Sequence, residues 1–583
     1  MSIRFYLILI GINIACFLPF YFINYRKHPN PVEFLTANWR SPWQLFKKLY
    51  VKYPLSDPFR VNFDYTFLIL IVSALQFSPT WITLLAALVW TFGFLDFSYS
   101  AVMVLIFRRR PSLRSDLMFA RSGLSVIHDY RRLFVIGIIV IVLLLVLMSA
   151  LTTAYLLQQS PPNRTVNLVL AFGLLLPAFY NWRAMRFPVF LFRTVYSPSL
   201  NFYRNYRFSQ AYESIHALDS SDFESLNDFT GVWLRSKPNF VTVCVESYGS
   251  FAHLDDATYA GVRDVLETYV NKFADAGLKV ASTFSEPPLF AGGSWLSYTS
   301  FTYGLKIDNH TLHYALFDQN DSFGAYESLF HVLKRNGYQS FLLCPLGGYE
   351  ASAVNWDSIN RCFFSDKNYD FESLKYHGRT YPFMSRQIAY FPADQYSLNF
   401  AYSAASAEGS SPFSLFFCTL NSHYPWDSPS RSIAAWRELQ ANDHGPIVSD
   451  DQAANLADKY RAAIRYQLDY LLRFTLDHAD ENLIVVLFGD HQAPFVTPEQ
   501  FGKKTPVHVI SHSGVVIQAL CENGFVEGLD LSKYHGDGIR HEGFLSLFMR
   551  AVNKAFGQTP DTHIELREGG ANLHGLLSGK GRE

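Results

Sequence analysis

The sequence has little charge for its length. Of its 583 residues, 17% are charged, against about a quarter in soluble globular proteins. The net charge is −1, so the chain has no basic excess for binding along a nucleic-acid backbone. The composition therefore argues against a nucleic-acid partner. It predicts two or more domains, part of them embedded in lipid.

Cysteines are few and widely spaced. There are six, with no CxxC pair: Cys16, Cys244, Cys344, Cys362, Cys418 and Cys521. Three of them, at positions 16, 244 and 418, fall in apolar runs, where cysteine usually acts as a small hydrophobic side chain. We therefore expect no disulfide framework, and cysteine usage does not indicate a redox compartment.

Long apolar runs dominate the first 190 residues. Each approaches the ~20 residues that a helix needs to cross a hydrocarbon core. The runs are Phe5 to Ile23, Phe63 to Phe77, Trp81 to Phe107, Leu133 to Leu157 and Val166 to Tyr180. Buried helices of a soluble protein explain the uncharged fourth run poorly. The first run lacks a clear small-residue cleavage site, so we interpret it as an anchor rather than a signal peptide. Residues 1–182 are thus predicted to form a transmembrane domain of about five helices.

The charges around these runs conflict over orientation. Five spans with a cytoplasmic N-terminus place everything after Trp182 outside. The loop after the third run, however, carries seven arginines from Arg108 to Arg132, and such loops are usually cytoplasmic. Its amphipathic stretches could instead lie along an anionic leaflet, and a different number of spans would also remove the conflict. We expect a multi-pass protein of the cell (inner or plasma) membrane whose later residues are extracytoplasmic.

The character of the chain changes at about residues 183 and 238. Residues 183–237 mix arginines with aromatic residues, and we interpret them as an interfacial linker because Arg and Tyr suit the headgroup zone. A solvated linker is the alternative. From residue 238, apolar strand-like runs such as FVTVCV and LIVVLFG alternate with helical segments. This alternation predicts that residues 238–583 form an α/β domain with a mainly parallel sheet covered by helices on both faces.

Polar residues follow several of the expected strands. Glu246 follows FVTVCV, His423 follows LFFCTLNS, and Asp490 and His491 follow LIVVLFG. Ligands bind beyond the carboxyl ends of strands in open α/β sheets, and burying these groups unpaired would be costly. Mixed oxygen and nitrogen ligands suit Mn²⁺ or Zn²⁺ better than Ca²⁺. Singly, each residue could be a helix cap or a surface group; together they predict a divalent metal site.

Ser294 is the candidate nucleophile. In PPLFAGGSWLSYTS, Gly292 and Gly293 allow a tight turn, and Ser294 can open a helix beginning at Trp295. The N-terminus of a helix presents free N–H groups to an anion such as a phosphoryl group. A serine hydroxyl needs a base or a metal to activate it. The alternative is that Ser294 is an ordinary N-cap residue.

At these motifs the chain resembles the lipoteichoic acid synthase family and the related phosphoglycerol transferases of the alkaline phosphatase/sulfatase superfamily. The matching segments are NFVTVCVESYGS, AGGSWLSYTS, TLNSHYPW and LFGDHQ, in the family's order. The resemblance implies that Glu246, Ser294, Asp490 and His491 bind a metal ion and that Ser294 is also the nucleophile. It implies further that His423 contacts the substrate headgroup.

The sequence departs from the family pattern at two points. Serine stands where the family usually has threonine. The Trp-Asn-Arg-type element that contacts the headgroup is represented by NWDSINR, which supplies Trp356 and a displaced Arg361. The segment from Ser294 lacks the Cys- or Ser-x-Pro-x-Arg sequence that sulfatases need to make formylglycine, which argues against arylsulfatase activity.

The function implied by the resemblance is transfer of a phosphoglycerol headgroup. The expected donor is a phospholipid such as phosphatidylglycerol, and the acceptor is an envelope glycan or lipid. One divalent ion is expected, Mn²⁺ first, with Zn²⁺ or Mg²⁺ as alternatives. Two other functions stay open: a phosphoethanolamine transferase with the same core, and a catalytically silent lipid-sensing membrane protein.

Overall fold

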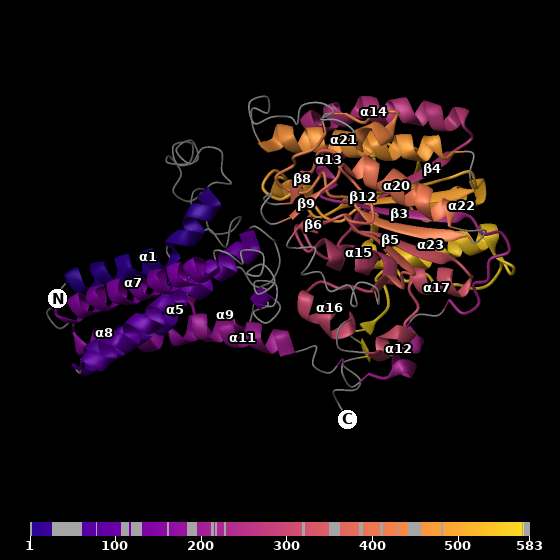
Figure 1. The fold of residues 1–583 in the computed structure, drawn as a ribbon. Helices are drawn as coiled ribbons and strands as arrows, with labels where there is room; N and C mark the ends of the chain where they lie inside the picture. The colour runs from indigo at the N-terminus through magenta and orange to yellow at the C-terminus, as the bar shows by residue number, and fades with distance from the viewer. Residues whose placement is uncertain are drawn as a thin grey trace. The chain divides into compact units, whose positions relative to one another are not determined.

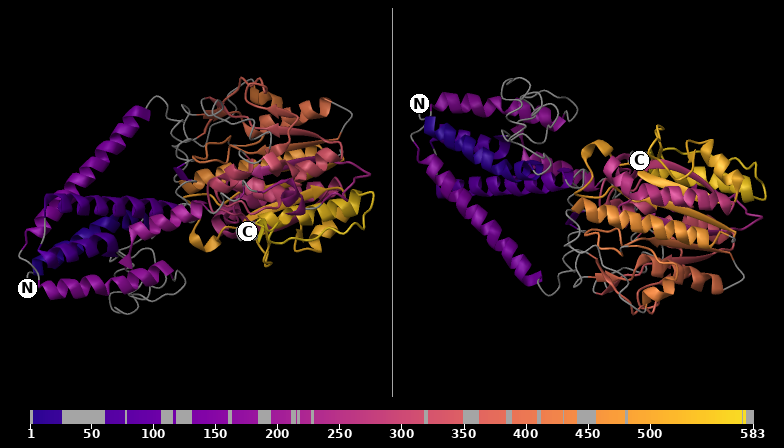
Figure 2. Two further views of the ribbon diagram at one scale, coloured as in Figure 1. Left: turned by 90° about the horizontal axis from the view of Figure 1, so that it is seen from below. Right: turned by 90° about the horizontal axis from the view of Figure 1, so that it is seen from above.

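The structure is a computed structural model of the chain, drawn in Figure 1. It describes residues 3–25, 61–76, 79–105, 116–117, 131–159, 163–183, 195–210, 215, 218–226, 229–317, 321–348, 362–383, 389–408, 412–429, 431–440, 456–479, 482–573 and 575–576. The chain divides into two compact units, the first formed by Met1–Leu117 and Ile127–Ala211 and the second mainly by Tyr212–Glu583. Figure 2 gives two further views of both.

The first unit is helical. Its helices are α1 (Ile3–Tyr25), α4 (Phe63–Leu75), α5 (Thr80–Leu105), α7 (Arg131–Leu157), α8 (Arg164–Gly173), α9 (Leu175–Arg183) and α11 (Pro198–Gln210). The short strands β1 (Val61–Asn62) and β2 (Val195–Tyr196) pair in parallel. Helix α5 packs against α1 and α7, and α4 packs against α8. Each expected apolar run therefore contains one of these helices, although the fifth is divided between α8 and α9.

Apolar side chains cover the outside of this unit. Leu143 and Met148 of α7 are 62% and 65% exposed, which is costly in water and favourable in lipid. Within the described residues, two helices are long and apolar enough to cross a membrane, Thr80–Ser100 and Ile136–Leu157. The apolar helices Ile3–Leu18, Phe63–Leu75 and Arg164–Phe179 are shorter. These features fit a membrane protein, while the number of five spans stays a prediction.

Part of the expected linker belongs to the first unit. Tyr196 donates a hydrogen bond to the Asp96 carboxylate (2.6 Å), and Asn201 at the start of α11 donates to the same carboxylate (3.0 Å). Further along α11, Phe202, Tyr203 and Tyr206 are exposed. These contacts hold β2 and α11 to the side of α5.

The second unit is built on a nine-stranded sheet. The strand order is β13-β4-β12-β11-β3-β10-β5-β7, with β14 beside β4. The strands are β3 (Asn239–Val245), β4 (Lys279–Glu286), β5 (Gln339–Leu343), β7 (Lys367–Tyr369), β10 (Phe413–Cys418), β11 (Leu483–Gly489), β12 (Thr505–Ser511), β13 (Val526–Glu527) and β14 (Ile539–Arg540). A separate small sheet contains β6 (Gly347–Gly348), β9 (Ala389–Phe391) and β8 (Tyr381–Phe383).

The expectation of a mainly parallel sheet is wrong, because the sheet is mixed. Strands β7, β5, β10, β3 and β11 are parallel, but β12 is antiparallel to both β11 and β4. A parallel return requires a crossover, usually through a helix. The connection from β11 to β12 contains only the short 3₁₀ turn Glu499–Phe501, so the chain returns in the opposite direction.

Helices cover both faces of the sheet (Figure 1). Alternate residues of β3 enter two different cores: Val241, Val243 and Val245 pack with one set of helices, and Phe240 and Cys244 with the other. The first set is α13 (Phe251–Leu254), α14 (Asp256–Asp275), α20 (Asp394–Ala407) and α21 (Leu456–Asp477). The second is α12 (Ser220–Leu226), α15 (Ser294–Tyr303), α16 (His310–Phe317), α17 (Leu329–Arg335), α22 (Gly514–Cys521) and α23 (His541–Phe556). The predicted two-sided covering is confirmed.

Candidate active site

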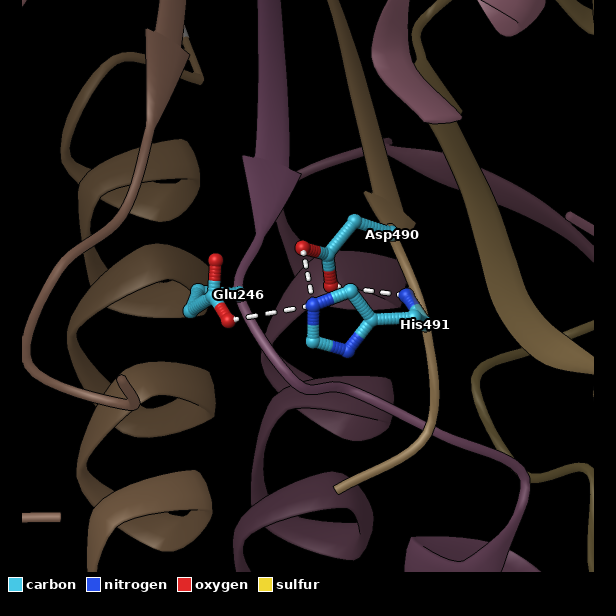
Figure 3. A group of neighbouring side chains, drawn as sticks. All are labelled: Glu246, Asp490 and His491. Carbon is cyan, nitrogen blue, oxygen red and sulfur yellow. Dashed lines mark hydrogen bonds and ion pairs between the residues drawn. The ribbon is translucent and has the colours of Figure 1, made fainter. Parts of the chain in front are cut away.

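The site lies where two neighbouring central strands end. Strands β3 and β11 are parallel, and their last residues, Val245 and Gly489, are register partners. The residues that follow, Glu246 and Asp490, therefore leave the sheet side by side, and His491 comes next (Figure 3). Sequence reasoning placed these side chains at one sheet edge, and the structure brings all three together.

The three side chains form a compact buried group. Their potential ligand atoms all lie within 4.8 Å of one another. His491 Nε2 lies 3.2 Å from Asp490 Oδ2 and 3.4 Å from Glu246 Oε1. Each residue is at most 4% exposed. Two buried carboxylates this close together repel each other, so a cation between them would stabilise the group.

Hydrogen bonding fixes which atoms face that position. His491 Nδ1 lies 2.9 Å from the Gln492 carbonyl oxygen, which can only accept, so Nδ1 carries a proton. The neutral imidazole then turns its Nε2 lone pair towards the carboxylates. Asp490 Oδ1 accepts from the N–H groups of Ser247 (2.8 Å) and His491 (2.7 Å), while Oδ2 has no hydrogen-bond partner among the described residues. Lone pairs of Nε2, Oδ2 and a Glu246 oxygen thus converge, as in a metal site with mixed ligands.

The close packing of these side chains shifts the pKa values of Asp490 and His491. Burial, and after it the charge of the Glu246 carboxylate, together raise the pKa of Asp490 to about 7. Burial lowers the pKa of His491, but the charges of Asp490 and Glu246 outweigh it, so the net shift is upward. A divalent cation would relieve both effects by replacing the protons.

Ser294 is the first residue of α15 and points at this group. Gly293 is the N-cap, with φ of 75°, a left-handed conformation that glycine adopts without strain. The helix was expected to begin one residue later, at Trp295. Ser294 Oγ donates a hydrogen bond to Glu246 Oε2 (2.8 Å) and lies 3.5 Å from His491 Nε2. The structure therefore brings Ser294 together with the three expected metal ligands.

Aromatic packing fixes α15, which begins with the candidate nucleophile Ser294, to β11, which is followed by two of the candidate ligands. The ring of Phe301 in α15 stacks on Phe488 of β11 and on Phe544 of α23, with centroid distances of 3.9 Å in both cases. Two rival hydroxyls on this helix are engaged elsewhere. Thr299 donates to the Trp295 carbonyl, and Ser300 donates to that of Leu296 (2.7 Å).

His423 lies in the loop after β10, near the group but outside it. Its ring stacks on Phe383 (centroid distance 4.1 Å), and its Nδ1 lies 2.6 Å from the Tyr424 carbonyl oxygen. Nδ1 therefore carries the proton, and Nε2 is free to accept. Burial lowers the pKa of His423 to about 4, and His491 and Asp490 are close enough for their charges to act on it. The expected headgroup residues Trp356 and Arg361 lie outside the described residues.

The loop after β10 is tied to the site by residues that sequence reasoning missed. Thr419 Oγ1 accepts from the Glu246 N–H (3.0 Å), and Asp394 accepts from the N–H groups of Leu420 (2.8 Å) and Asn421 (2.6 Å). Neither Thr419 nor Asp394 stands out in the sequence, because both are ordinary residues of turns and helix starts.

A second missed feature is a directional hydrogen-bond chain beside the site. The Leu531 N–H donates to His253 Nδ1 (3.4 Å), which leaves Nε2 to donate to the Tyr248 hydroxyl (2.6 Å). The Tyr248 hydroxyl donates in turn to His508 Nε2 (3.0 Å), and His508 Nδ1 donates to Ser282 (2.7 Å). All of these side chains are buried. His508 therefore belongs to this series of hydrogen bonds and not to the candidate metal group.

The fold and the site define the class. Residues 238–512 match the family model described as Sulfatase, so this part of the chain is similar to that family. The expected superfamily is confirmed. A comparison with curated proteins finds no match.

Within that class, several solved structures are similar in fold. One is the lipoteichoic acid synthase LtaP from Listeria monocytogenes, with 17% identity and a TM-score of 0.34 over 50% of this chain and 71% of that chain. Another is the integral membrane lipooligosaccharide phosphoethanolamine transferase A (EptA) from Neisseria meningitidis, with 13% identity and a TM-score of 0.43 over 91% and 94%. A third is the phosphoglycerol transferase GacH from Streptococcus pyogenes, with 10% identity and a TM-score of 0.34 over 64% and 89%. Likenesses at these identities and TM-scores leave the substrate open.

Proposed function

We propose that the protein is a membrane-bound, metal-dependent transferase that moves a phosphoglycerol headgroup from a phospholipid to an envelope glycan or lipid. The observation that carries this proposal is the position of Ser294. Its hydroxyl stands at the start of a ten-residue helix, 2.8 Å from Glu246 and 3.5 Å from His491, inside a sulfatase-like domain. A candidate nucleophile, a ligand group for a cation and the N-terminus of a helix, which favours an anion such as a phosphoryl group, thus meet at one place.

The residues that would hold the metal are Glu246, Asp490, His491 and Ser294. Three of them present lone pairs to a common point, and the buried Asp490 Oδ2 has no hydrogen-bond partner among the described residues, so the donor set fits a divalent ion. Mn²⁺ is the proposed ion, with Zn²⁺ and Mg²⁺ as alternatives. When bound, such an ion lowers the pKa of a serine hydroxyl and neutralises charge on phosphoryl oxygens.

The reaction is a double displacement. In the first step the Ser294 oxygen forms a bond to phosphorus, the bond from phosphorus to the diacylglycerol oxygen breaks, and the serine proton is passed on to that oxygen. In the second step an acceptor hydroxyl attacks the same phosphorus, the bond to Ser294 breaks, and the acceptor's proton restores the serine hydroxyl. Glu246 Oε2 receives the serine's hydrogen bond and is placed to take its proton.

His423 would bind the substrate rather than the metal. Its Nδ1 proton is committed to the Tyr424 carbonyl, so Nε2 can only accept a hydrogen bond while the ring is neutral. With a pKa of about 4, the ring is neutral at pH 7. A hydroxyl of the headgroup or of the acceptor is a suitable donor to it. Trp356 and Arg361 stay proposed headgroup contacts on the family resemblance alone.

The proposed arrangement assigns residues 1–182 to a transmembrane domain of about five helices and 183–237 to an interfacial linker. Residues 238–583 form the catalytic domain on the extracytoplasmic side of the cell membrane. A lipid donor would explain the apolar first unit, because a membrane anchor keeps the catalytic domain beside its lipid substrate.

The decisive experiment is to trap the intermediate. Full-length protein in detergent would be incubated with Mn²⁺ and phosphatidylglycerol, quenched in acid, digested and analysed by mass spectrometry. We expect the peptide containing Ser294 to gain one phosphoglycerol group. Ser294→Ala should abolish the adduct, whereas Ser297→Ala, which alters a buried hydroxyl on the same helix, should keep it. An adduct at Thr299 or Ser300 would refute the assignment, and an adduct formed only from phosphatidylethanolamine would change the donor.

A further inference from the structure

Asp394 is a fully buried carboxylate directed at the loop that carries His423. It is the first residue of α20 and is 0% exposed. One of its oxygens, Oδ2, accepts three hydrogen bonds: from the N–H groups of Leu420 (2.8 Å) and Asn421 (2.6 Å) and from Gln467 Nε2 of α21 (2.7 Å). The Asp394 N–H donates in return to Asn421 Oδ1 (2.8 Å). This one residue thus joins α20, α21 and the loop.

The same loop is also bonded to the candidate metal group. Thr419, at its beginning, accepts from the Glu246 N–H (3.0 Å), and its own N–H donates to the Cys244 carbonyl (2.9 Å). The His423 N–H donates to the Leu420 carbonyl (2.9 Å), which closes the turn on the two residues that Asp394 holds. The position of the His423 ring therefore depends on a turn that Thr419 fixes at one end and Asp394 fixes in the middle.

We propose that Asp394 is a positioning residue that sets His423 relative to the metal group. Its burial is costly for a carboxylate, and its hydrogen bonds to backbone N–H groups offset part of that cost. All three bonds to Oδ2 serve to hold the loop and its supporting helix. The inference rests on the proposed function, since it assigns His423 a role in turnover.

The test is a double-mutant cycle on the full-length protein, measured as transfer from phosphatidylglycerol. Asp394→Ala should lower kcat by about 10- to 100-fold, the scale expected when a catalytic group is displaced by about 1 Å. In a His423→Ala background the same change should alter kcat within about twofold, because the group it positions is gone. Asp394→Asn, which keeps a carbonyl oxygen to accept the hydrogen bonds, should recover most of the activity. Metal content should equal that of the wild type in every variant.

A matched control separates positioning from general damage to the fold. Asn336, at the end of α17, is buried and likewise makes three hydrogen bonds, with Leu234, Val232 and Val332, but it precedes the amino end of β5. Asn336→Ala should lower stability and leave kcat of the folded protein unchanged. Equal losses of kcat from Asp394→Ala with and without His423 would overturn the inference. Normal turnover by His423→Ala would instead overturn the role given to His423 in the proposed function.

Discussion

The hydrogen-bond chain centred on Tyr248 allows a sharp test of the structure. Tyr248→Phe removes one oxygen and keeps the ring. The His508 Nε2 lone pair then has no donor, and the His253 Nε2 proton has no acceptor, although both groups are buried. Leaving one buried polar group unpaired costs about 1–3 kcal/mol. With two such groups, the structure predicts a loss of roughly 2 to 6 kcal/mol in the free energy of unfolding.

Tyr470→Phe is the matched control. Tyr470 is also fully buried, in α21, but its hydroxyl has no hydrogen-bond partner among the described residues. Removing that oxygen relieves an unpaired polar group, so this variant should be as stable as the wild type or more stable. The measurement is urea unfolding of each purified full-length variant in detergent, followed by near-ultraviolet circular dichroism. Equal stability of the two variants would refute the assigned donors and acceptors.

Three further predictions follow from the site and its surroundings. Burial lowers the pKa of His253 to about 4 from 6.5, so the unfolded chain takes up its proton first. The stability that this neutral ring contributes should be complete above pH 6.5 and be lost as the pH falls towards 4, by roughly 3 kcal/mol. The measurement is the free energy of unfolding of the wild type and of His253→Gln between pH 7 and 4. Parallel curves of this free energy against pH would contradict the prediction. Asp490→Ala should abolish both metal binding, measured by elemental analysis, and transfer, and full metal occupancy would remove Asp490 from the ligand set. Phe495 is 66% exposed, has a φ of 68° and packs against Tyr424, and it should contact the proposed lipid donor. Phe495→Gly should raise the KM for lipid in vesicles without loss of stability. An unchanged KM would argue against that contact.

The site residues were predicted best from the sequence where a strongly apolar strand is followed by a polar residue. Strands β3 and β11 are continuous apolar runs, so Glu246, Asp490 and His491 stood out at their ends. Strands β4 and β12 were not predicted, because KVASTFSE and TPVHVIS contain many small and polar residues. Their antiparallel pairing makes the sheet mixed. This pairing depends on a connection without a helix between β11 and β12, which no local sequence pattern predicts.

The supporting residues were hidden for a different reason. Asp394, Thr419 and Tyr248 act through partners far away in the chain, and a single polar residue in a helix start or a turn has many ordinary explanations. The break of the fifth apolar run between α8 and α9 was also hidden, because Gly173 and Leu174 continue an apolar run. Hydropathy reports the lipid-facing character of such a run but not the continuity of its helix.

The position of β11 between β3 and β12 has a consequence for biosynthesis. Glu246 and Ser294 are made early, while Asp490 and His491 follow only after β5, β10 and α21. On the proposed function, a growing chain therefore carries Ser294 long before it can complete the ligand group that would activate this serine. Any product ending before Leu483 lacks Asp490 and His491 of that group and also leaves an open edge on β3. On the same proposal, ion binding would mark completed synthesis, and an unfinished chain would lack two of the ligands that activate Ser294.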